Sequence, residues 1–337
     1  MRVRPGRWTP LTLSGLGRVP ARFIPPCGRL PCVWLLGMLL PFLLTCCASV
    51  GRLFDPATEC DYQLRATVPL EVTHGRPLVD AEVNGDPVRL IVDTGAETTL
   101  FTASAARRLE LVGTGSPLRL VGVGGEGTGS ATTVHTLALG DLVLRNLPVV
   151  VDGDGGGTNQ ALGNIADGIV GLDVLSHFDV DLDMPNERIT FYRARACENG
   201  KPDWTLAFTT LDAEVSARLH LIVPVGLDGQ TLSATIDSGS DSTVLADRDM
   251  ARFGISQITL RRDPVIRVRG IAPTLSPIHV HRFRALAIGD LLFLKPEIPV
   301  SPLPDFVGDM LLGSDVLREH RAWLSWSSGR VYLAIGR

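Results

Sequence analysis

The sequence has few aromatic residues and little excess of charge of either sign. Only 11 Phe, 5 Trp and 3 Tyr stand against 35 Gly and 23 Pro in 337 residues, a composition that favours short strands joined by many turns. Long amphipathic helical patterns are scarce. The formal net charge of −4 is small and mixed in sign, which gives no indication of a nucleic-acid partner. The seven histidines are scattered and no cysteine or histidine run has zinc-site spacing, so we predict no metal and no cofactor.

The first 51 residues differ from the rest of the chain. Six arginines within the first 29 residues precede an uncharged stretch at 30–51, LPCVWLLGMLLPFLLTCCASVG. This pattern is typical of an export signal or a membrane anchor whose basic end stays in the cytoplasm. The segment LTCC resembles a bacterial lipobox, which would make Cys47 the lipidated residue, and a plain signal anchor is the alternative. Either one predicts an extracytoplasmic (periplasmic) protein held to the membrane through its N-terminus.

The number of cysteines agrees with an extracytoplasmic location. If the first 46 residues are removed and Cys47 is lipidated, only Cys60 and Cys197 remain, an even pair in an oxidising space. We expect a disulfide between them, which would join the two ends of one lobe. Two unrelated buried thiols are the alternative.

An internal repeat organises the remainder of the chain. Residues 83–101, VNGDPVRLIVDTGAETTLF, align without a gap on residues 227–245, LDGQTLSATIDSGSDSTVL. Two further matches follow in the same order, LALGDL (137–142) with LAIGDL (286–291) and DGIVGLDVL (167–175) with DMLLGSDVL (309–317). Three matched segments in one order predict a tandem duplication.

The duplication predicts two all-β lobes. Lobe one covers residues 61–195, a polar linker covers 196–204, and lobe two covers 205–337. In each lobe an Asn-Gly or Asp-Gly pair, at 84–85 and 228–229, predicts a tight hairpin that leads into an apolar strand. At 337 residues the chain is long enough for each lobe to bury its own core.

Asp93 and Asp237 end apolar strands at equivalent points of the two repeats. One Asp-Thr-Gly sequence alone is most simply a turn. A pseudo-twofold axis between the lobes would bring the two carboxyl groups face to face, where they would share a proton because both cannot ionise cheaply. Such a pair can take a proton from a water molecule while donating one to a carbonyl oxygen, which is the chemistry that amide hydrolysis needs.

The residues that follow each aspartate suit this role. Thr94 and Ser238 offer hydroxyls that can hydrogen-bond across the axis and hold both loops. Gly95 and Gly239 permit a close backbone approach that a side chain would block. The sequence therefore predicts a rigid scaffold around the two carboxyl groups.

The motifs DTGAETTL and DSGSDSTV resemble those of the retropepsin-like aspartyl proteases of the pepsin superfamily, most closely the bacterial members with two lobes in one chain. Each motif is followed by two apolar residues and a glycine, at 169–171 and 311–313. The resemblance implies two homologous pepsin-like β-barrel lobes related by a pseudo-twofold axis, with the active site in the cleft between them. It makes Asp93 and Asp237 the catalytic dyad and the Thr/Ser-Gly pairs its scaffold.

The same resemblance places a flap over the cleft. In lobe one the glycine-rich segment LVGVGGEGTGS implies a flap tip at Gly122, Val123, Gly124 and Gly125. Lobe two carries residues 268–281 at the corresponding place, stiffened by two prolines. Neither tip has the tyrosine that is typical of pepsin-type flaps.

Other polar residues receive simpler assignments. We expect Asp173 and Asp315 to cap short helices after the matched glycines. His279 and His281 alternate on one strand, and we expect both to face solvent.

The predicted function is aspartic-type endopeptidase activity on peptide or protein substrates. Glu97 and Asp241 are candidates for contact with the substrate backbone, and surface ion pairs are the alternative for both. A protein that binds peptide or envelope polymer on the same duplicated fold without cutting it is the alternative function. Loss of one aspartate would favour that alternative, and both aspartates are present.

Overall fold

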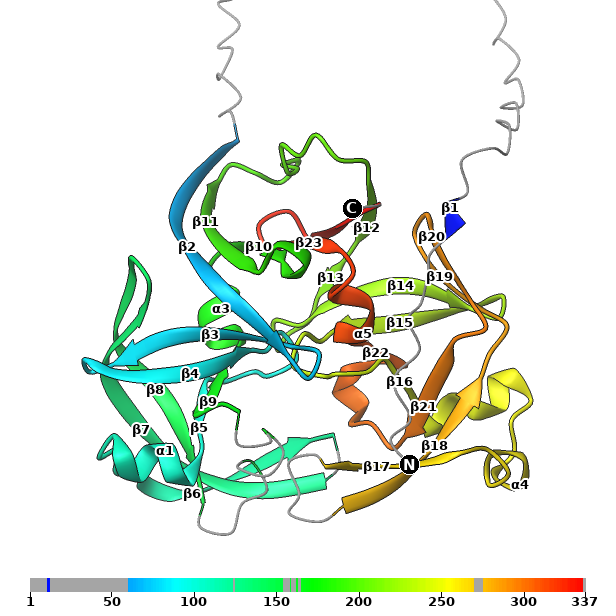
Figure 1. Cartoon of the computed structure of the whole chain (residues 1–337), viewed down its shortest axis with the longest axis horizontal. Helices are drawn as coiled ribbons and strands as arrows, with labels where there is room; N and C mark the ends of the chain where they lie inside the picture. Colours follow the sequence, from blue (N-terminus) through cyan, green and yellow to red (C-terminus); the bar gives the residue numbers. More distant parts are fainter. Residues whose placement is uncertain are drawn as a thin grey trace, which may run out of the picture.

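The computed structural model of the protein describes residues 60–335, apart from 124, 154–157, 159–161, 163–164 and 270–274, together with residues 11–12. This part of the chain consists mostly of strands in two lobes (Figure 1), which confirms the predicted all-β, two-lobed architecture. None of the described helices has the length and apolar character that crossing a membrane requires. Cys47 and the predicted uncharged segment lie outside the described residues.

Two sheets contain all the described strands. The larger sheet has the order β12 (Phe208–Asp212), β24 (Arg330–Ala334), β23 (Arg321–Ser325), β10 (Asp179–Asp183), β11 (Arg188–Arg195), β2 (Asp61–Thr73), β3 (Arg76–Val83), β4 (Asp86–Val92), β9 (Gly168–Val170), β5 (Leu100–Phe101), β8 (Leu142–Asp152), β7 (Gly125–Leu139) and β6 (Thr114–Gly122). The second sheet has the order β1 (Leu11–Thr12), β20 (Leu291–Leu294), β19 (Ala285–Ile288), β14 (Leu221–Leu227), β15 (Gln230–Ile236), β22 (Met310–Leu312), β16 (Val244–Ala246), β21 (Glu297–Ser301), β18 (Leu275–Arg282) and β17 (Val265–Arg269), with β13 (Glu214–Val215) paired to β14.

The helices are short connections between these strands. They are α1 (Ala103–Arg108), α3 (Leu172–Leu175), α4 (Gln257–Leu260) and α5 (Ser314–Leu317), with the 3-10 turns η1 (Met184–Asn186), η2 (Asp247–Phe253) and η3 (Asp305–Val307). The hydroxyl of Thr102 caps α1, because it accepts a hydrogen bond from the Ala105 N–H at 3.2 Å.

The two predicted hairpins form where the sequence places them. Asn84 and Gly85 join β3 to β4, and Asp228 and Gly229 join β14 to β15. All four residues have positive φ, from 48° to 93°, which is the backbone conformation of the tightest hairpin turns. The turns set the register that leads each apolar strand to its aspartate.

A parallel strand pair follows in each lobe. In lobe one β4 runs parallel to β9, with Val92 beside Val170. In lobe two β15 runs parallel to β22, with Ile236 beside Leu312. The two apolar residues before each matched glycine therefore lie next to the strand that ends in aspartate, although they are about 75 residues away in the sequence.

A shared sheet joins the lobes. Strand β10 of the first repeat pairs antiparallel with β23 of the second, so that Val180 faces Leu324 and Leu182 faces Ala322. On either side of this pair lie β11 with β2 and β24 with β12, an arrangement that is symmetrical about the β10–β23 contact. A disulfide between Cys60 and Cys197 ties the start of β2 to the segment after β11.

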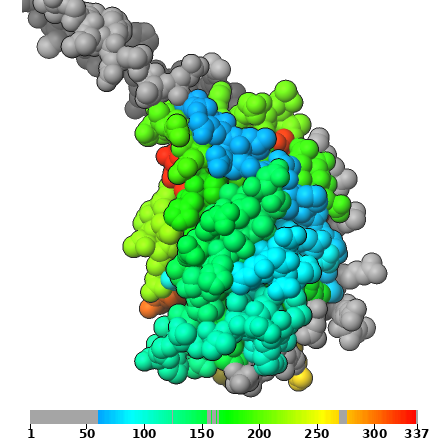
Figure 2. Space-filling view, turned by 90° about the vertical axis from the view of Figure 1, so that its left-hand side faces the viewer, coloured from blue at the N-terminus to red at the C-terminus, as the bar shows by residue number. Residues whose placement is uncertain are grey.

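One main core and two smaller apolar clusters stabilise the fold. The main core runs through both lobes, and its strands bury alternate residues, as β2 does with Ala66, Val68 and Leu70. Figure 2 shows the outer surface of lobe one as a continuous face, coloured from blue to green. The lobe-one cleft cluster contains Leu78, Ile91, Leu162, Ile165, Ala166 and Ile169. The lobe-two cleft cluster contains Val244, Ala246, Leu303, Phe306, Val307 and Leu311.

Candidate active site

The parallel strand pairs position both aspartates. The Asp93 N–H donates to the Val170 carbonyl at 3.0 Å, and the Asp237 N–H donates to the Leu312 carbonyl at 3.0 Å. Each aspartate therefore leaves its strand at a point that the neighbouring strand fixes. The structure brings the two loops together between the lobes, as the repeat predicted.

Thr94 and Ser238 lock the two loops to each other. The Thr94 N–H donates to the Ser238 hydroxyl at 3.1 Å, and the Ser238 N–H donates to the Thr94 hydroxyl at 3.0 Å. Each hydroxyl in turn donates to a carbonyl of the opposite strand, that of Ile236 at 2.8 Å or that of Val92 at 2.7 Å. Both side chains are almost fully buried, so these four bonds form without competition from water.

Backbone N–H groups hold the carboxyl groups. The Gly95 N–H donates to Asp93 Oδ1 at 2.9 Å. The N–H groups of Gly239 and Ser240 donate to Asp237 Oδ1 at 3.0 and 2.9 Å. The carboxyl groups of Asp93 and Asp237 lie close enough for each to shift the pKa of the other.

The glycines are necessary at this contact. A Cβ atom on Gly95 would lie 2.6 Å from each carboxylate oxygen of Asp237, and one on Gly239 would overlap the carboxyl group of Asp93. Each carboxyl group thus rests against the glycine of the opposite lobe. Only a residue without a side chain leaves that space.

The surroundings favour the protonated form of the pair. Burial raises the pKa of Asp93 above the ordinary value of an aspartate. Burial, and then the charge of Asp93, raise the pKa of Asp237. Arg76, whose side chain lines the same cleft, acts in the opposite direction on both pKa values. The pair therefore keeps one shared proton at a pH at which ordinary aspartates have lost theirs.

The dyad lies at the bottom of a cleft of about 270 Å³. Both cleft clusters contribute apolar walls, for example Ile169 from lobe one and Leu311 from lobe two. Ser240 and Asp241 supply polar groups close to the dyad. The cleft combines apolar walls with a few polar groups, as substrate-binding sites usually do.

Two hairpins cover this cleft. The hairpin of β6 and β7 carries Gly122, Val123 and Gly125 of the predicted flap, and Gly124 lies outside the described residues. Val123 reaches across to pack against the lobe-two cleft cluster. The hairpin of β17 and β18 also lines the cleft, through Ile266, Val268 and Ile278, and its tip at 270–274 is not among the described residues.

Asp173 and Asp315 do not cap helices as predicted. The cap positions of α3 and α5 are glycines, and neither helix has a side-chain cap. Asp173 instead accepts from the N–H and hydroxyl of Thr99, at 2.9 and 2.8 Å, and Asp315 accepts from the same groups of Thr243, at 2.9 and 2.7 Å. Both carboxylates therefore brace the loop that follows a catalytic candidate.

The expectation for the two histidines needs correction, and one of the two alternatives for Glu97 is observed. His281 does not simply face solvent, because its Nδ1 lies 2.6 Å from Asp263 Oδ2 and its side chain is 22% exposed. His279 Nδ1 lies 3.4 Å from the carbonyl of the same Asp263. Glu97 forms an ion pair with Arg218 at 2.5 Å, which is the alternative that the sequence left open for it.

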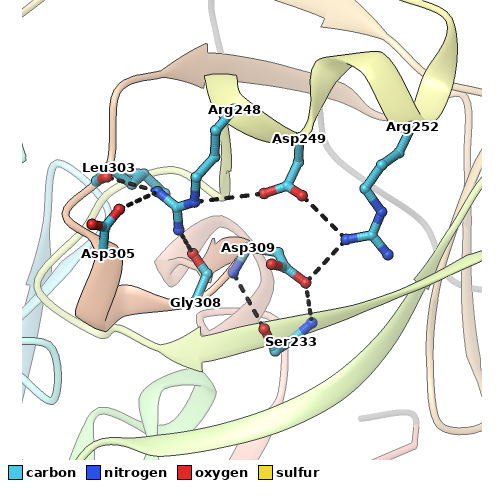
Figure 3. Close-up of polar contacts among 8 residues, drawn as sticks. All are labelled: Ser233, Arg248, Asp249, Arg252, Leu303, Asp305, Gly308 and Asp309. Atoms are coloured by element: carbon cyan, nitrogen blue, oxygen red, sulfur yellow. Dashed lines mark hydrogen bonds and ion pairs between the residues drawn. The ribbon is translucent and has the colours of Figure 1, made fainter.

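A group of polar contacts in lobe two supports the cleft wall (Figure 3). Arg248, at the start of η2, donates to the carbonyls of Leu303 and Gly308, the latter at very short range, and so spans the loop that carries η3. Asp309 accepts from the Ser233 N–H at 3.0 Å and from Arg252 at 3.2 Å. At the equivalent point of lobe one, Asp167 accepts a hydrogen bond from the Arg89 N–H and forms an ion pair with Arg108.

Sequence reasoning missed these pairs and two residues of the cleft itself. Asp167 and Asp309 were visible as a match within DGIVGLDVL and DMLLGSDVL, and this is the signal that could have found them. Arg76 and His220 are separated by 144 residues, the same interval as Thr94 and Ser238, and both line the cleft. Their types differ, so the alignment of the repeats did not draw attention to them. Among the described residues, no group of three or more potential ligands is placed to hold a metal ion.

The match to a protein-family model agrees with this geometry. The family model described as aspartyl protease matches residues 79–174 and 223–316, which together make up more than half of the chain. No curated protein matches the sequence. Among solved structures, the chain is similar to the crystal structure of aspartic proteinase from Irpex lacteus, with 14% sequence identity and a TM-score of 0.45, covering 80% of this chain and 97% of that chain. Because the matched residues span both Asp-Thr/Ser-Gly loops and both parallel strand pairs, this chain belongs to the aspartyl protease family.

Proposed function

We propose that the protein is an endopeptidase that hydrolyses peptide bonds with a water molecule activated between Asp93 and Asp237. The observation that carries the proposal is the pair of buried carboxyl groups, each packed against the glycine of the opposite lobe, at the bottom of a cleft that two hairpins cover. The family membership supports the same chemistry.

The reaction proceeds by general acid and base catalysis. The ionised carboxylate takes one proton from the water as the water oxygen attacks the carbonyl carbon of the substrate. The protonated carboxyl group gives its proton to the carbonyl oxygen, which yields a tetrahedral diol. The carboxyl group that took the proton of the water gives it to the amide nitrogen, and the other carboxylate takes a proton from a hydroxyl of the diol as the C–N bond breaks. A new carboxyl and a new amino terminus leave, and the dyad again holds one proton.

The surrounding residues serve this cycle in three ways. The bonds between Thr94 and Ser238 keep the two carboxyl groups at one distance through both proton transfers. Burial favours a shared proton, so the acid and the base are present together. The apolar walls and Val123 exclude water other than the reacting molecule.

Incubation of the full chain, purified in detergent, with a mixed peptide library tests the proposal. We expect cleavage products from the wild-type protein and none above background from Asp93→Asn or Asp237→Asn. Asp86→Asn, an exposed position on β4, is the matched control and should cleave like the wild type. Binding of peptide without cleavage by the wild-type protein would instead support the non-catalytic alternative.

We also infer that the N-terminus holds the protein to the membrane on its periplasmic side. The disulfide between Cys60 and Cys197 supports an oxidising compartment. Labelled palmitate and membrane fractionation of the wild type and of Cys47→Ser test the lipoprotein form, in which the variant loses the label. Membrane retention without any label would indicate a signal anchor, and a wild-type protein found in the cytoplasm would overturn the inference.

A further inference from the structure

Asp241 places a carboxylate in the wall of the cleft, close to the catalytic pair. It follows Asp237 by four residues in the same loop, it is exposed, and it lines the cleft. Its Oδ1 accepts a hydrogen bond from the Ser242 hydroxyl at 3.2 Å. Within the described part of the chain, no basic side chain lies within 4.0 Å of this carboxylate. Its negative charge is therefore available to a substrate.

The equivalent carboxylate of lobe one is neutralised. The repeat aligns Glu97 with Asp241, and Glu97 forms an ion pair with Arg218 of lobe two at 2.5 Å. The Arg218 guanidinium also lies over the Phe306 ring, with 4.4 Å to the ring centroid, which holds it in place. At the position of Arg218, lobe one carries His74. The cleft is therefore bordered by a neutral ion pair on one side and by a single carboxylate on the other.

The other charges near Asp241 do not cancel it. A Cβ atom on Gly75 would lie 3.4 Å from Arg318 Nη1 and 3.8 Å from Asp241 Cβ, so Arg318 packs against the same turn. Arg318 also lies 3.8 Å from the carboxylate of Glu319, which offsets its charge. Arg76 lines the cleft as well, and there the negative charge of the catalytic pair offsets it. The charge of Asp241 remains after these groups are counted.

The place of Asp241 in the loop limits which residue of a substrate can meet it. Four residues of chain span at most about 14 Å. The real separation is shorter, because the Ser240 N–H folds the loop back onto Asp237 Oδ1 at 2.9 Å. A peptide that lies extended in the cleft advances about 3.3 Å per residue. The carboxylate therefore meets substrate side chains within about four residues of the scissile bond.

We propose that Asp241 is a specificity-determining residue, which selects substrates that carry a lysine or arginine side chain close to the scissile bond. The proposal rests on the proposed function and adds a substrate class to it. The ammonium or guanidinium group of the substrate forms an ion pair with the Asp241 carboxylate. The two hairpins that cover the cleft exclude water and so strengthen this pair. A glutamine at the same place lacks the ion pair, and a glutamate is repelled.

Octapeptide pools with one fixed position and the others randomised test this preference, with the full chain purified in detergent. The fixed residue is Lys, Gln or Glu, and mass spectrometry locates the cleaved bond. At one distance from that bond, we expect cleavage about five- to tenfold faster with Lys than with Gln, and slower with Glu than with Gln. Raising the salt concentration to about 0.5 M should lower the Lys-to-Gln ratio to about twofold, because salt screens a partly exposed ion pair.

Three variants assign the preference to one side chain. Asp241→Asn keeps the shape without the charge and should bring the Lys-to-Gln ratio to within about twofold. Asp241→Lys should reverse the order, so that the Glu pool is cleaved fastest. Asp305→Asn is the matched control, because Asp305 on η3 is a fully exposed carboxylate that does not line the cleft, and this variant should keep the wild-type ratio. A ratio near one in the wild type, or an unchanged ratio in Asp241→Asn, would overturn the proposal.

A binding measurement separates this proposal from the proposed function. If the wild type cleaves none of the pools, the proposed function fails. Retention of the same pools on immobilised full-length protein then measures the preference without catalysis. The wild type and Asp305→Asn should retain the Lys pools more than the Gln pools, and Asp241→Asn should retain both alike. Equal retention of the two pools by the wild type would overturn the role of Asp241.

Discussion

Replacing Gly95 with alanine tests whether the two carboxyl groups need the space that glycine leaves between the lobes. The added Cβ would lie 2.6 Å from both carboxylate oxygens of Asp237, whereas ordinary van der Waals contact begins at 3.4 Å. Because Asp237 Cγ would lie nearer still, at 2.4 Å, the carboxyl group or the loop must move by about 1 Å. Gly95 does not have a positive φ, so the effect of the substitution is steric.

The size of the effect follows from that shift. A misplacement of about 1 Å at reacting groups costs roughly a hundredfold in rate. Forcing an extra methyl group into a packed site costs about 1–3 kcal/mol of stability. We therefore expect Gly95→Ala to lower kcat/KM about a hundredfold and to lower the free energy of unfolding in urea by about 1–3 kcal/mol.

Gly226→Ala is the matched control. Gly226 lies in β14, and a Cβ there would meet its nearest neighbour, Ala287 Cβ, at an ordinary 3.5 Å. This variant should keep wild-type cleavage and lose less than about 1 kcal/mol. Wild-type activity in a folded Gly95→Ala protein would refute the reasoning, because the carboxyl groups would then not occupy the positions described.

Three further predictions concern stability and substrate binding. Because the pKa of Asp237 is raised in the folded protein, its contribution to stability is complete below the ordinary aspartate range and is lost as the pH rises through the raised pKa. In urea titrations at several pH values, Asp237→Asn should therefore show a smaller fall in the free energy of unfolding above about pH 4 than the wild type does. An equal fall in both proteins would contradict the direction of the pKa shift. In the same urea assay, Thr94→Val should lower the free energy of unfolding by about 2–4 kcal/mol, because it removes the partner of the buried Ser238 N–H and of the Ile236 carbonyl. Thr94→Ser keeps the hydroxyl and should lower it by less than about 1 kcal/mol. Equal stability of the two variants would count against the hydrogen bonds between the lobes. Val123→Ser should raise the KM for a cleaved peptide about three- to tenfold, because it weakens the apolar contact across the cleft. Val112→Ser, at a position that is 73% exposed, is the control and should leave KM unchanged. An unaltered KM in Val123→Ser would show that the hairpin tip does not cover the substrate.

Much of the site was predictable because it depends on local sequence and on the repeat. The Asn-Gly and Asp-Gly turns fix the hairpins, and the strands after them end in Asp93 and Asp237 at equivalent points. Because the halves of a duplicated fold are arranged symmetrically, the equivalent loops of the two repeats are expected to lie opposite each other. The hydrogen bonds between Thr94 and Ser238 follow from that symmetry.

The remaining features depend on contacts that no local pattern encodes. His220 is far from Gly95 in the sequence, and only the packing of one lobe on the other brings its ring to that carbonyl. Asp173 and Asp315 lie close to the starts of α3 and α5, but a glycine occupies each cap position. Their carboxylates instead accept hydrogen bonds from threonine hydroxyls of the neighbouring loops. His281 alternates like a solvent-facing residue, yet Asp263 of a preceding turn meets it.

The central claim is that Asp93 and Asp237 together hydrolyse peptide bonds. The most direct measurement is the rate of peptide cleavage by the wild type and by Asp237→Asn under identical conditions, with both proteins shown to be folded. We predict a fall of at least about a hundredfold in the variant, because it loses half of the acid and base pair. Equal rates in the two proteins would contradict the account.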